Sequence, residues 1–348
     1  MKSRHFFAGV NSPQGFFSCF DDIASDKKCV RKIYLKGGPG MGKSSLMKKI
    51  AERAEEEKYD TDIFHCSSDT NSLDGIFIPK LKTAVIDATA PHNYDPVYPG
   101  VTGEIFCTAD YLDREKTAEH SEEIIHFSEH KKRAFGKAYN YLSAAAPVID
   151  DIKTMYENHT YMHGINLEVQ KAAEKYLPES TAPKAGELRR LFISAVAPDG
   201  FVNYTDSAFA GCRLISVRGG CGTEIFMRNI ARIALSRGHR TEVFCCPMFP
   251  DTKPEHVILP DIGVAFTTYN HYHHESGEDF IDIDEYLREV PSGVDEGFEI
   301  ASRLLRKAVN ALADARAAHS FLEGFYTPYM DFEALSEDAD RLTDKIFN

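Results

Sequence analysis

The feature that most constrains this chain of 348 residues is a glycine-rich segment, KGGPGMGKSSLM, at residues 36–47. It matches the phosphate-binding loop pattern G-x-x-x-x-G-K-[ST], with Gly37, Gly42, Lys43 and Ser44 at the fixed positions. Residues 31–35 before it are typical of a short buried strand, and apolar residues after it recur at helical spacing. The segment therefore has the strand–loop–helix context that the motif requires.

Each residue type in this loop predicts a contact with a nucleotide. Glycines permit backbone angles that are closed to other residues, so consecutive N–H groups can surround a phosphate at the start of the helix. We expect Lys43 to contact the outer phosphates and the Ser44 hydroxyl to bind Mg²⁺. The predicted nucleotide-binding residues are Gly37, Gly38, Pro39, Gly40, Met41, Gly42, Lys43, Ser44 and Ser45.

A carboxylate at the end of a neighbouring buried strand usually completes such a magnesium site. Asp87 fits this role best because it follows the apolar run at 84–86, and Asp69, which ends the strand at 61–66, is the alternative. We therefore predict Ser44 and Asp87 as metal ligands, and Lys43 and Asp87 as catalytic residues.

The residue after Asp87 is Ala88, whereas many enzymes that hydrolyse nucleoside triphosphates carry a glutamate there to polarise water. This substitution argues against fast intrinsic hydrolysis. Glu104 is a candidate for that role if its loop folds back. Arg114 or the cluster at 131–133 is a candidate source of positive charge, but a solvated helix face is the favoured interpretation of each.

The chain also contains an internal repeat, whose matching segments occur in the same order in both halves. The matches pair residues 4–21 with 189–206, 33–38 with 215–220, 62–66 with 242–246, and 137–142 with 307–312. A polar segment at 178–183 has linker composition. We therefore divide the chain into a first domain, 1–182, and a second domain, 183–348.

Alternating strands and helices in each half predict an α/β fold. We expect two tandem P-loop NTPase-like domains, each a mainly parallel sheet covered by helices, with a helical extension at about 111–177 and 282–347. The second half reads GGCGTEI at 219–225, so the Gly-Lys-Ser segment is missing and Glu224 adds a negative charge. We predict that this copy binds triphosphate poorly and is structural or regulatory.

Two further groups of residues bear on metal binding. None of the eight cysteines forms a C-x-x-C pair, so a zinc finger is excluded and the thiols are expected to be reduced. The tract Asn270–His274 holds three histidines, but no Cys or acidic spacing accompanies it. We interpret it as a remnant of a loop that faces the site.

Bulk composition limits the partners that this chain can have. With 40 basic and 53 acidic residues, the formal net charge is −13, which argues against a broad nucleic-acid-binding surface. The start of the chain lacks the apolar core of a signal peptide, and no run reaches the length of a membrane span. We expect a cytoplasmic protein, with a protein partner or a second copy of the chain left open.

These motifs resemble those of a family of bacterial proteins, labelled as ATPases, that carry two P-loop NTPase domains in tandem. The resemblance rests on the loop at 37–47, the stretches at 65–69 and 72–75, and the segment from Asp87 to Gly100, and it covers nearly the whole chain. It implies the fold and nucleotide binding, but no substrate. The family usually keeps a phosphate loop in both halves, and this chain departs from that pattern in its second half.

Three functions follow as hypotheses. The leading one is an ATP- or GTP-binding protein with Mg²⁺-dependent hydrolysis in the first half. The second is a small-molecule or nucleotide kinase, in which the loop with Asp69 and Asp74, or the loop with His92, holds the phosphate acceptor. The third is a nucleotide-sensing interaction module that binds tightly without turnover.

Overall fold

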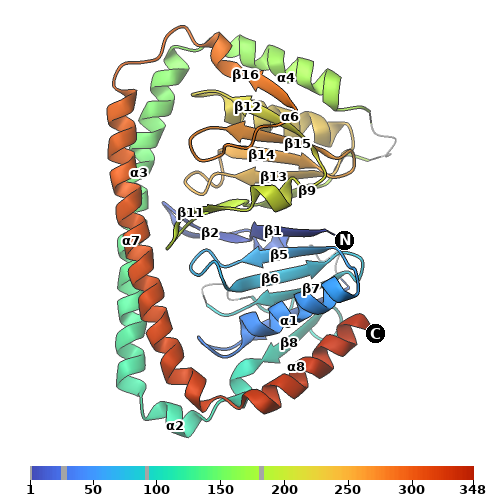
Figure 1. The fold of residues 1–348 in the computed structure, drawn as a ribbon, viewed down its shortest axis with the longest axis vertical. Helices are drawn as coiled ribbons and strands as arrows, with labels where there is room; N and C mark the ends of the chain where they lie inside the picture. The colour runs from blue at the N-terminus through green and yellow to red at the C-terminus, as the bar shows by residue number, and fades with distance from the viewer. Residues whose placement is uncertain (1, 25–29, 91–93, 180–183) are drawn as a thin grey trace.

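The computed structural model of the chain describes residues 2–24, 30–90, 94–179 and 184–348. The fold is α/β, with two six-stranded mixed sheets that lie one above the other along a pair of long helices (Figure 1). Among the described residues, no helix is both long enough and apolar enough to span a bilayer.

The first sheet has the strand order β1-β5-β6-β7-β4-β8. Strand β6 runs antiparallel to its neighbours β5 and β7, and the other strands share one direction, so the sheet is mainly parallel as predicted. The strands are β1 (Ser3–Phe7), β4 (Arg31–Lys36), β5 (Thr61–His65), β6 (Leu73–Ile78), β7 (Thr83–Asp87) and β8 (Gly103–Cys107).

The second sheet repeats this arrangement in the order β16-β12-β15-β14-β13-β9, with β14 as the antiparallel strand. Its strands are β9 (Leu188–Leu191), β12 (Arg213–Arg218), β13 (Thr241–Cys245), β14 (Pro254–Leu259), β15 (Val264–Tyr269) and β16 (Asp279–Asp282). Two hairpins also correspond, β2 (Gly9–Ser12) with β3 (Gly15–Ser18), and β10 (Ser194–Ala197) with β11 (Gly200–Asn203). The internal repeat predicted from the sequence is therefore a structural repeat.

The helices follow the same repeat. The α-helices are α1 (Lys43–Glu56), α2 (Arg114–Ala118), α3 (Ser121–Asn158), α4 (Met162–Tyr176), α5 (Thr205–Ala208), α6 (Thr223–Ser236), α7 (Val294–Tyr326) and α8 (Phe332–Phe347). Short 3-10 turns are η1 (Phe20–Asp22), η2 (Thr108–Tyr111), η3 (Ile283–Tyr286) and η4 (Thr327–Tyr329). The predicted helical extensions correspond to α2–α4 and to α7–α8.

Helices cover one face of each sheet and shorter segments cover the other. In the first half, α1 packs its Leu46, Met47 and Ile50 against apolar residues of β4, β6 and β7. The opposite face packs against Phe20 and Ile23, which belong to η1 and the turn after it. The prediction of helix cover is therefore correct for one face of the sheet only.

The last helix of each half packs on the sheet of the other half. Ala339, Leu342 and Ile346 of α8 belong to the apolar core of the first sheet. Ile165 and Val169 of α4 belong to the core of the second sheet. The sequence boundary at 182/183 therefore separates two repeats, while each packed sheet uses a helix from the opposite side of that boundary.

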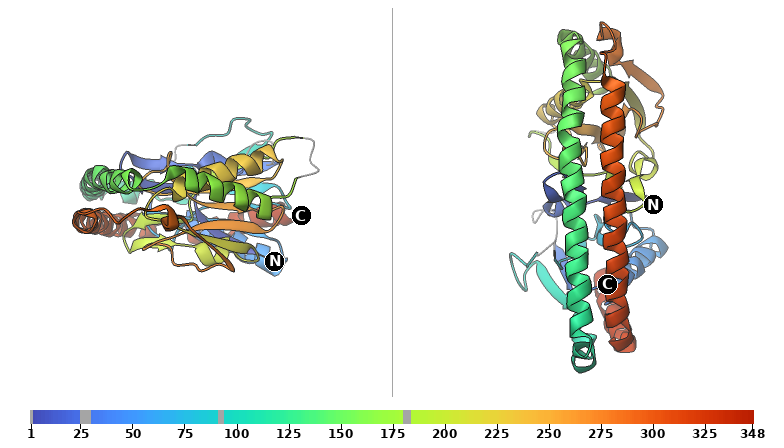
Figure 2. Two further views of the ribbon diagram at one scale, coloured as in Figure 1. Left: turned by 90° about the horizontal axis from the view of Figure 1, so that it is seen from above. Right: turned by 90° about the vertical axis from the view of Figure 1, so that its left-hand side faces the viewer.

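Helices α3 and α7 lie side by side along the length of the molecule (Figure 2). Near each end of this helix pair, a backbone hydrogen bond joins the first half of the chain to the second half. Asp113 N donates to Tyr329 O, and Tyr161 N donates to Tyr286 O, each at 2.9 Å. This arrangement carries α8 and α4 across to the sheets that they cover.

The two sheets meet at β1 and at the residue after β9, where Phe7 and Phe192 exchange backbone hydrogen bonds of 2.8 and 3.1 Å. Beside them, Arg4 binds Asp62 at 2.9 Å and Glu242 at 2.7 Å, and Arg189 binds Asp62 at 2.6 Å. Although burial alone would raise the pKa of Asp62, the two guanidinium groups hold it below its ordinary value. Residues that correspond in the repeat thus form a shared ion cluster at the junction.

Candidate functional site

The predicted phosphate loop connects β4 to α1, which begins at Lys43 directly after Gly42. Gly40 and Gly42 have φ values of 68° and 82°, a left-handed conformation that favours glycine. A Cβ atom at Gly42 would also lie 2.9 Å from Leu335 of α8. The backbone angles at Gly40 and Gly42 therefore favour glycine, and a neighbouring helix also approaches Gly42 closely.

Lys43 lies inside this loop. Its Nζ donates hydrogen bonds to the carbonyl oxygens of Gly37 and Gly38 at 2.7 and 2.8 Å, and lies 3.8 Å from Asp87 Oδ2. The side chain is mostly buried, so its positive charge is held at the centre of the loop. The structure thus brings together the two residues predicted to be catalytic.

The two predicted metal ligands lie at the same end of the sheet. Ser44 Oγ accepts a hydrogen bond from Leu73 N at 3.0 Å, and Asp87 Oδ1 accepts one from Thr89 N at 2.8 Å. Burial raises the pKa of Asp87, while Lys43 and Thr89 oppose that rise. A hydroxyl and a carboxylate beside a lysine form a donor set of the type that binds magnesium with phosphates.

Asp74 is a site residue that the sequence analysis placed only in an acceptor loop. The β5–β6 pairing shifts so that Phe64 faces Gly75 and His65 faces Leu73, which leaves Asp74 as the extra residue of a β-bulge. Asp74 is buried, and burial together with the negative charge of Asp87 raises its pKa to about 8. Asp74 belongs to the sequence run LDGIFI, which forms the buried antiparallel strand β6. The sequence analysis did not predict this strand.

The other acidic candidates lie elsewhere or have local partners. The prediction that Glu104 polarises the attacking water is wrong. Glu104 lies on β8 opposite Ile33, away from the end of β4 that leads into the loop, and it binds Arg31 at 2.6 Å. Asp69 accepts a hydrogen bond from the Ser72 hydroxyl at 2.6 Å in the turn before β6. Asp69 therefore stays near the site, and Glu104 does not.

The end of α7 lies against the phosphate loop. A Cβ atom at Gly40 would be 2.6 Å from Thr327 Oγ1 and 3.2 Å from the Cα of Glu323. Burial, followed by the charge of Asp69, raises the pKa of the Glu323 carboxylate, while the backbone of Gly40 opposes that rise. A helix from the second half thus places a carboxylate beside the loop of the first half.

Of the basic candidates, Lys131 faces this region from α3. Its Nζ lies 3.2 Å from His319 Nδ1 on α7, and burial, followed by Lys131, lowers the pKa of His319 to about 4. Lys132 and Arg133 are exposed on the same helix, and Arg114 pairs with Asp110 at 3.8 Å on the surface. Arg114, Lys132 and Arg133 therefore belong to solvated helix surfaces, as the alternative interpretation predicts.

The loop of the second half is already occupied by groups of the protein itself. Glu224 is buried at the start of α6, and Lys153 of α3 lies 3.2 Å from it. Gly220 N donates to Asp284 Oδ1 at 2.8 Å, and a Cβ atom at Gly220 would lie 2.4 Å from Tyr156. Two carboxylates thus lie at the end of the loop where the first half has Lys43 and Ser44.

Comparison with protein-family models, with curated proteins and with solved structures finds no match for this chain.

Proposed function

We propose that residues 37–45 bind ATP or GTP with Mg²⁺, and that the first half hydrolyses the nucleotide slowly. The observation that carries this proposal is the position of Lys43, held by two carbonyl oxygens of its own loop and 3.8 Å from Asp87. A triphosphate offers the lysine anionic partners in place of neutral carbonyl oxygens, which adds a direct attraction between opposite charges.

Each residue of the site has a defined role in this proposal. The backbone N–H groups of residues 38 and 40–45 and the amino end of α1 bind the phosphate oxygens, and Lys43 neutralises the outer phosphates. Ser44 and Asp87 would hold Mg²⁺, which offsets phosphate charge, and Asp74 lies close enough to orient its water ligands. Burial, followed by the negative charge of Asp87, raises the pKa of Asp74, and a divalent cation would offset that repulsion.

The second half serves as a structural and regulatory copy in this proposal. Its loop carries Thr223 and Glu224 where the first loop carries Lys43 and Ser44, and Glu224 already has Lys153 as a partner. A polyphosphate at that loop would meet the buried charge of Glu224. We therefore expect one nucleotide per chain.

One observation favours a nucleotide-sensing module as the second candidate. Ala88 is buried directly after Asp87, so no carboxylate follows the strand end to activate water. Glu323 lies beside the loop and belongs to α7, which runs past both sheets. In that case nucleotide binding would change the affinity for a partner without measurable turnover.

The test is nucleotide binding and turnover in the full chain and in Lys43→Ala. Calorimetry with ATP and Mg²⁺ should give one site for the wild type and at least about 100-fold weaker binding for the variant, corresponding to about 2.7 kcal/mol for a lost charge-assisted contact. Lys48→Ala, an exposed lysine on the same helix, is the matched control and should bind normally.

Three results would contradict parts of this proposal. Equal affinity of Lys43→Ala and the wild type would exclude the loop as the nucleotide site. Two nucleotides per chain would refute the loss of the second site. Transfer of the γ-phosphate to a small molecule, without release of free phosphate, would favour the kinase hypothesis instead.

A further inference from the structure

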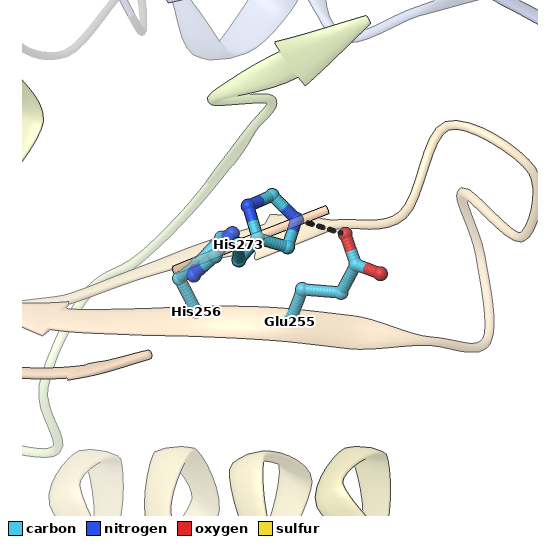
Figure 3. Close-up of side chains that lie close together, drawn as sticks. All are labelled: Glu255, His256 and His273. Carbon is cyan, nitrogen blue, oxygen red and sulfur yellow. Dashed lines mark hydrogen bonds and ion pairs between the residues drawn. The ribbon is translucent and has the colours of Figure 1, made fainter. Parts of the chain in front are cut away.

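The C-terminal half contains a buried cluster of possible metal ligands: Glu255, His256 and His273 (Figure 3). One ligand atom from each residue lies within 4.8 Å of the others, and all three side chains are buried. His273 is the central histidine of the tract at 270–274, whose acidic partner the sequence alone did not reveal. That partner, Glu255, precedes the tract by at least fifteen residues and is adjacent to His273 only in the folded protein.

A β-bulge explains why neighbouring residues can point into one site. On β14, Phe244 faces His256 and Cys245 faces Pro254, so Glu255 is the extra residue of the bulge. In a regular strand, Glu255 and His256 would project to opposite faces of the sheet. The bulge instead brings both ligand atoms near His273, which follows the adjacent strand β15.

The distances suit a tetrahedral ion of the Zn²⁺ type. Glu255 Oε2 and His273 Nε2 are 3.3 Å apart, and bonds of about 2.0–2.1 Å to one tetrahedral ion place two ligand atoms roughly 3.3 Å apart. The second oxygen, Oε1, lies 3.3 Å from Lys253 Nζ, which leaves Oε2 toward the imidazole rings. Imidazole and carboxylate are ligands that zinc accepts.

Unpaired nitrogen atoms provide an independent indication of a ligand. His256 Nδ1 lies 2.9 Å from the Thr267 hydroxyl, whereas His256 Nε2 and His273 Nδ1 have no hydrogen-bond partner among the described residues. Buried polar atoms without a partner are rare because they lose their hydration.

We propose that Glu255, one nitrogen of His273 and Nε2 of His256 bind one Zn²⁺-type ion in the C-terminal half. The Thr267 contact fixes the orientation of His256, as outer hydrogen bonds do in metal sites. In the repeat, Glu255 corresponds to Asp74 and His256 to Gly75, so the first half lacks the histidine. The copy that lost its phosphate loop thus carries a different ligand set at the same bulge, and this proposal stands independently of nucleotide binding.

Metal binding by the full wild-type chain tests the proposal directly. The protein is stripped with a chelator and titrated with Zn²⁺, and separately with Co²⁺, whose visible absorption reports tetrahedral geometry. We expect one equivalent of Zn²⁺, a tetrahedral Co²⁺ spectrum, and a higher unfolding temperature with Zn²⁺, because the ion binds only the folded state. Failure to bind one equivalent, or an octahedral Co²⁺ spectrum, would overturn the proposal.

Matched variants locate the bound ion. His273→Gln should weaken Zn²⁺ binding at least about 100-fold, as loss of a direct ligand exceeds the 10- to 100-fold cost of losing an outer partner. His274→Gln, at an exposed neighbouring position, should bind as the wild type does. If exposed His271 and His274 account for the binding, their double substitution removes it and the proposal fails. The wild-type titrations decide the question even where His273→Gln does not fold.

Discussion

Two adjacent positions at the residue scale distinguish the two loops. Lys43 and Ser44 begin α1, whereas Thr223 and Glu224 begin α6 at the corresponding place. The first pair leaves one positive charge inside the loop, and the second pair leaves one negative charge that Lys153 offsets. The start of the corresponding helix therefore carries a lysine inside the loop in one half and a buried glutamate paired with Lys153 in the other.

Asp74 leads to a prediction about pH. Its pKa of about 8 lies above that of an unfolded aspartate, so the folded protein holds a proton there at neutral pH. Because a nearby Mg²⁺ favours the ionised Asp74 carboxylate, Mg²⁺-dependent nucleotide affinity should rise by up to about tenfold per pH unit and level off above about pH 8. Calorimetry between about pH 6 and pH 9 measures this dependence.

Asp74→Asn is the variant that checks the source of the effect. It removes the titrating proton but keeps the size of the side chain, so the rise with pH should disappear. A wild-type affinity that is flat across this range, or an unchanged slope in the variant, would show that Asp74 takes no part in binding magnesium.

The informative features at the element scale are two bulges and the end of one helix. The bulges on β6 and β14 place Asp74 and Glu255 at equivalent positions, so the acidic residue belongs to the fold unit shared by both halves. The end of α7 adds Glu323, whose backbone approaches Gly40 closely and whose carboxylate pKa the Gly40 backbone lowers. A phosphate bound in the loop would meet the negative charge of this carboxylate.

We therefore predict that Glu323→Gln tightens ATP binding by about fivefold, equivalent to about 1 kcal/mol for a removed repulsion near the surface. Glu299→Gln, at an exposed position on the same helix, is the control and should leave affinity unchanged. Equilibrium binding of a fluorescent ATP analogue measures both. Normal binding with loss of turnover in Glu323→Gln would instead identify Glu323 as a residue that acts on the attacking water.

The exchange of terminal helices is the main feature at the scale of the whole molecule. Helix α8 completes the core of the first sheet, and α4 completes the core of the second. The ion cluster of Arg4, Arg189, Asp62 and Glu242 then joins the two sheets at their shared junction. Separate halves cut at 182/183 would each lack a helix that covers their own sheet.

This arrangement predicts that a substitution near residue 340 weakens the first half of the chain. Leu342→Ala should cost about 3 kcal/mol, because it leaves a cavity against the core of the first sheet. Arg341→Ala, at the neighbouring exposed position, should cost less than about 0.5 kcal/mol. Hydrogen exchange should increase in β4 and α1 of the Leu342→Ala variant. If hydrogen exchange increased only in β12 and α6, the packing of α8 on the first sheet would be contradicted.

Several elements were predictable from local pattern. The loop at 37–42 lies between β4 and α1, and Lys43 and Asp87 are close together, because the loop motif and the strand end each carry a local signal. Strand β6 was missed because its residues are buried throughout and show no alternation of polar and apolar residues. Asp74 was consequently taken for a loop residue.

The sequence by itself determined the repeat, the α/β class and the place of the glycine-rich loop between strand and helix, since each depends on residues that are neighbours in the chain. Only the tertiary structure decided that α4 and α8 cross over, that Glu323 contacts the loop, and that Glu255 joins His273. The physical reason is that these contacts join segments far apart in sequence. Burial of apolar surface selects such pairings, and it acts on the assembled fold.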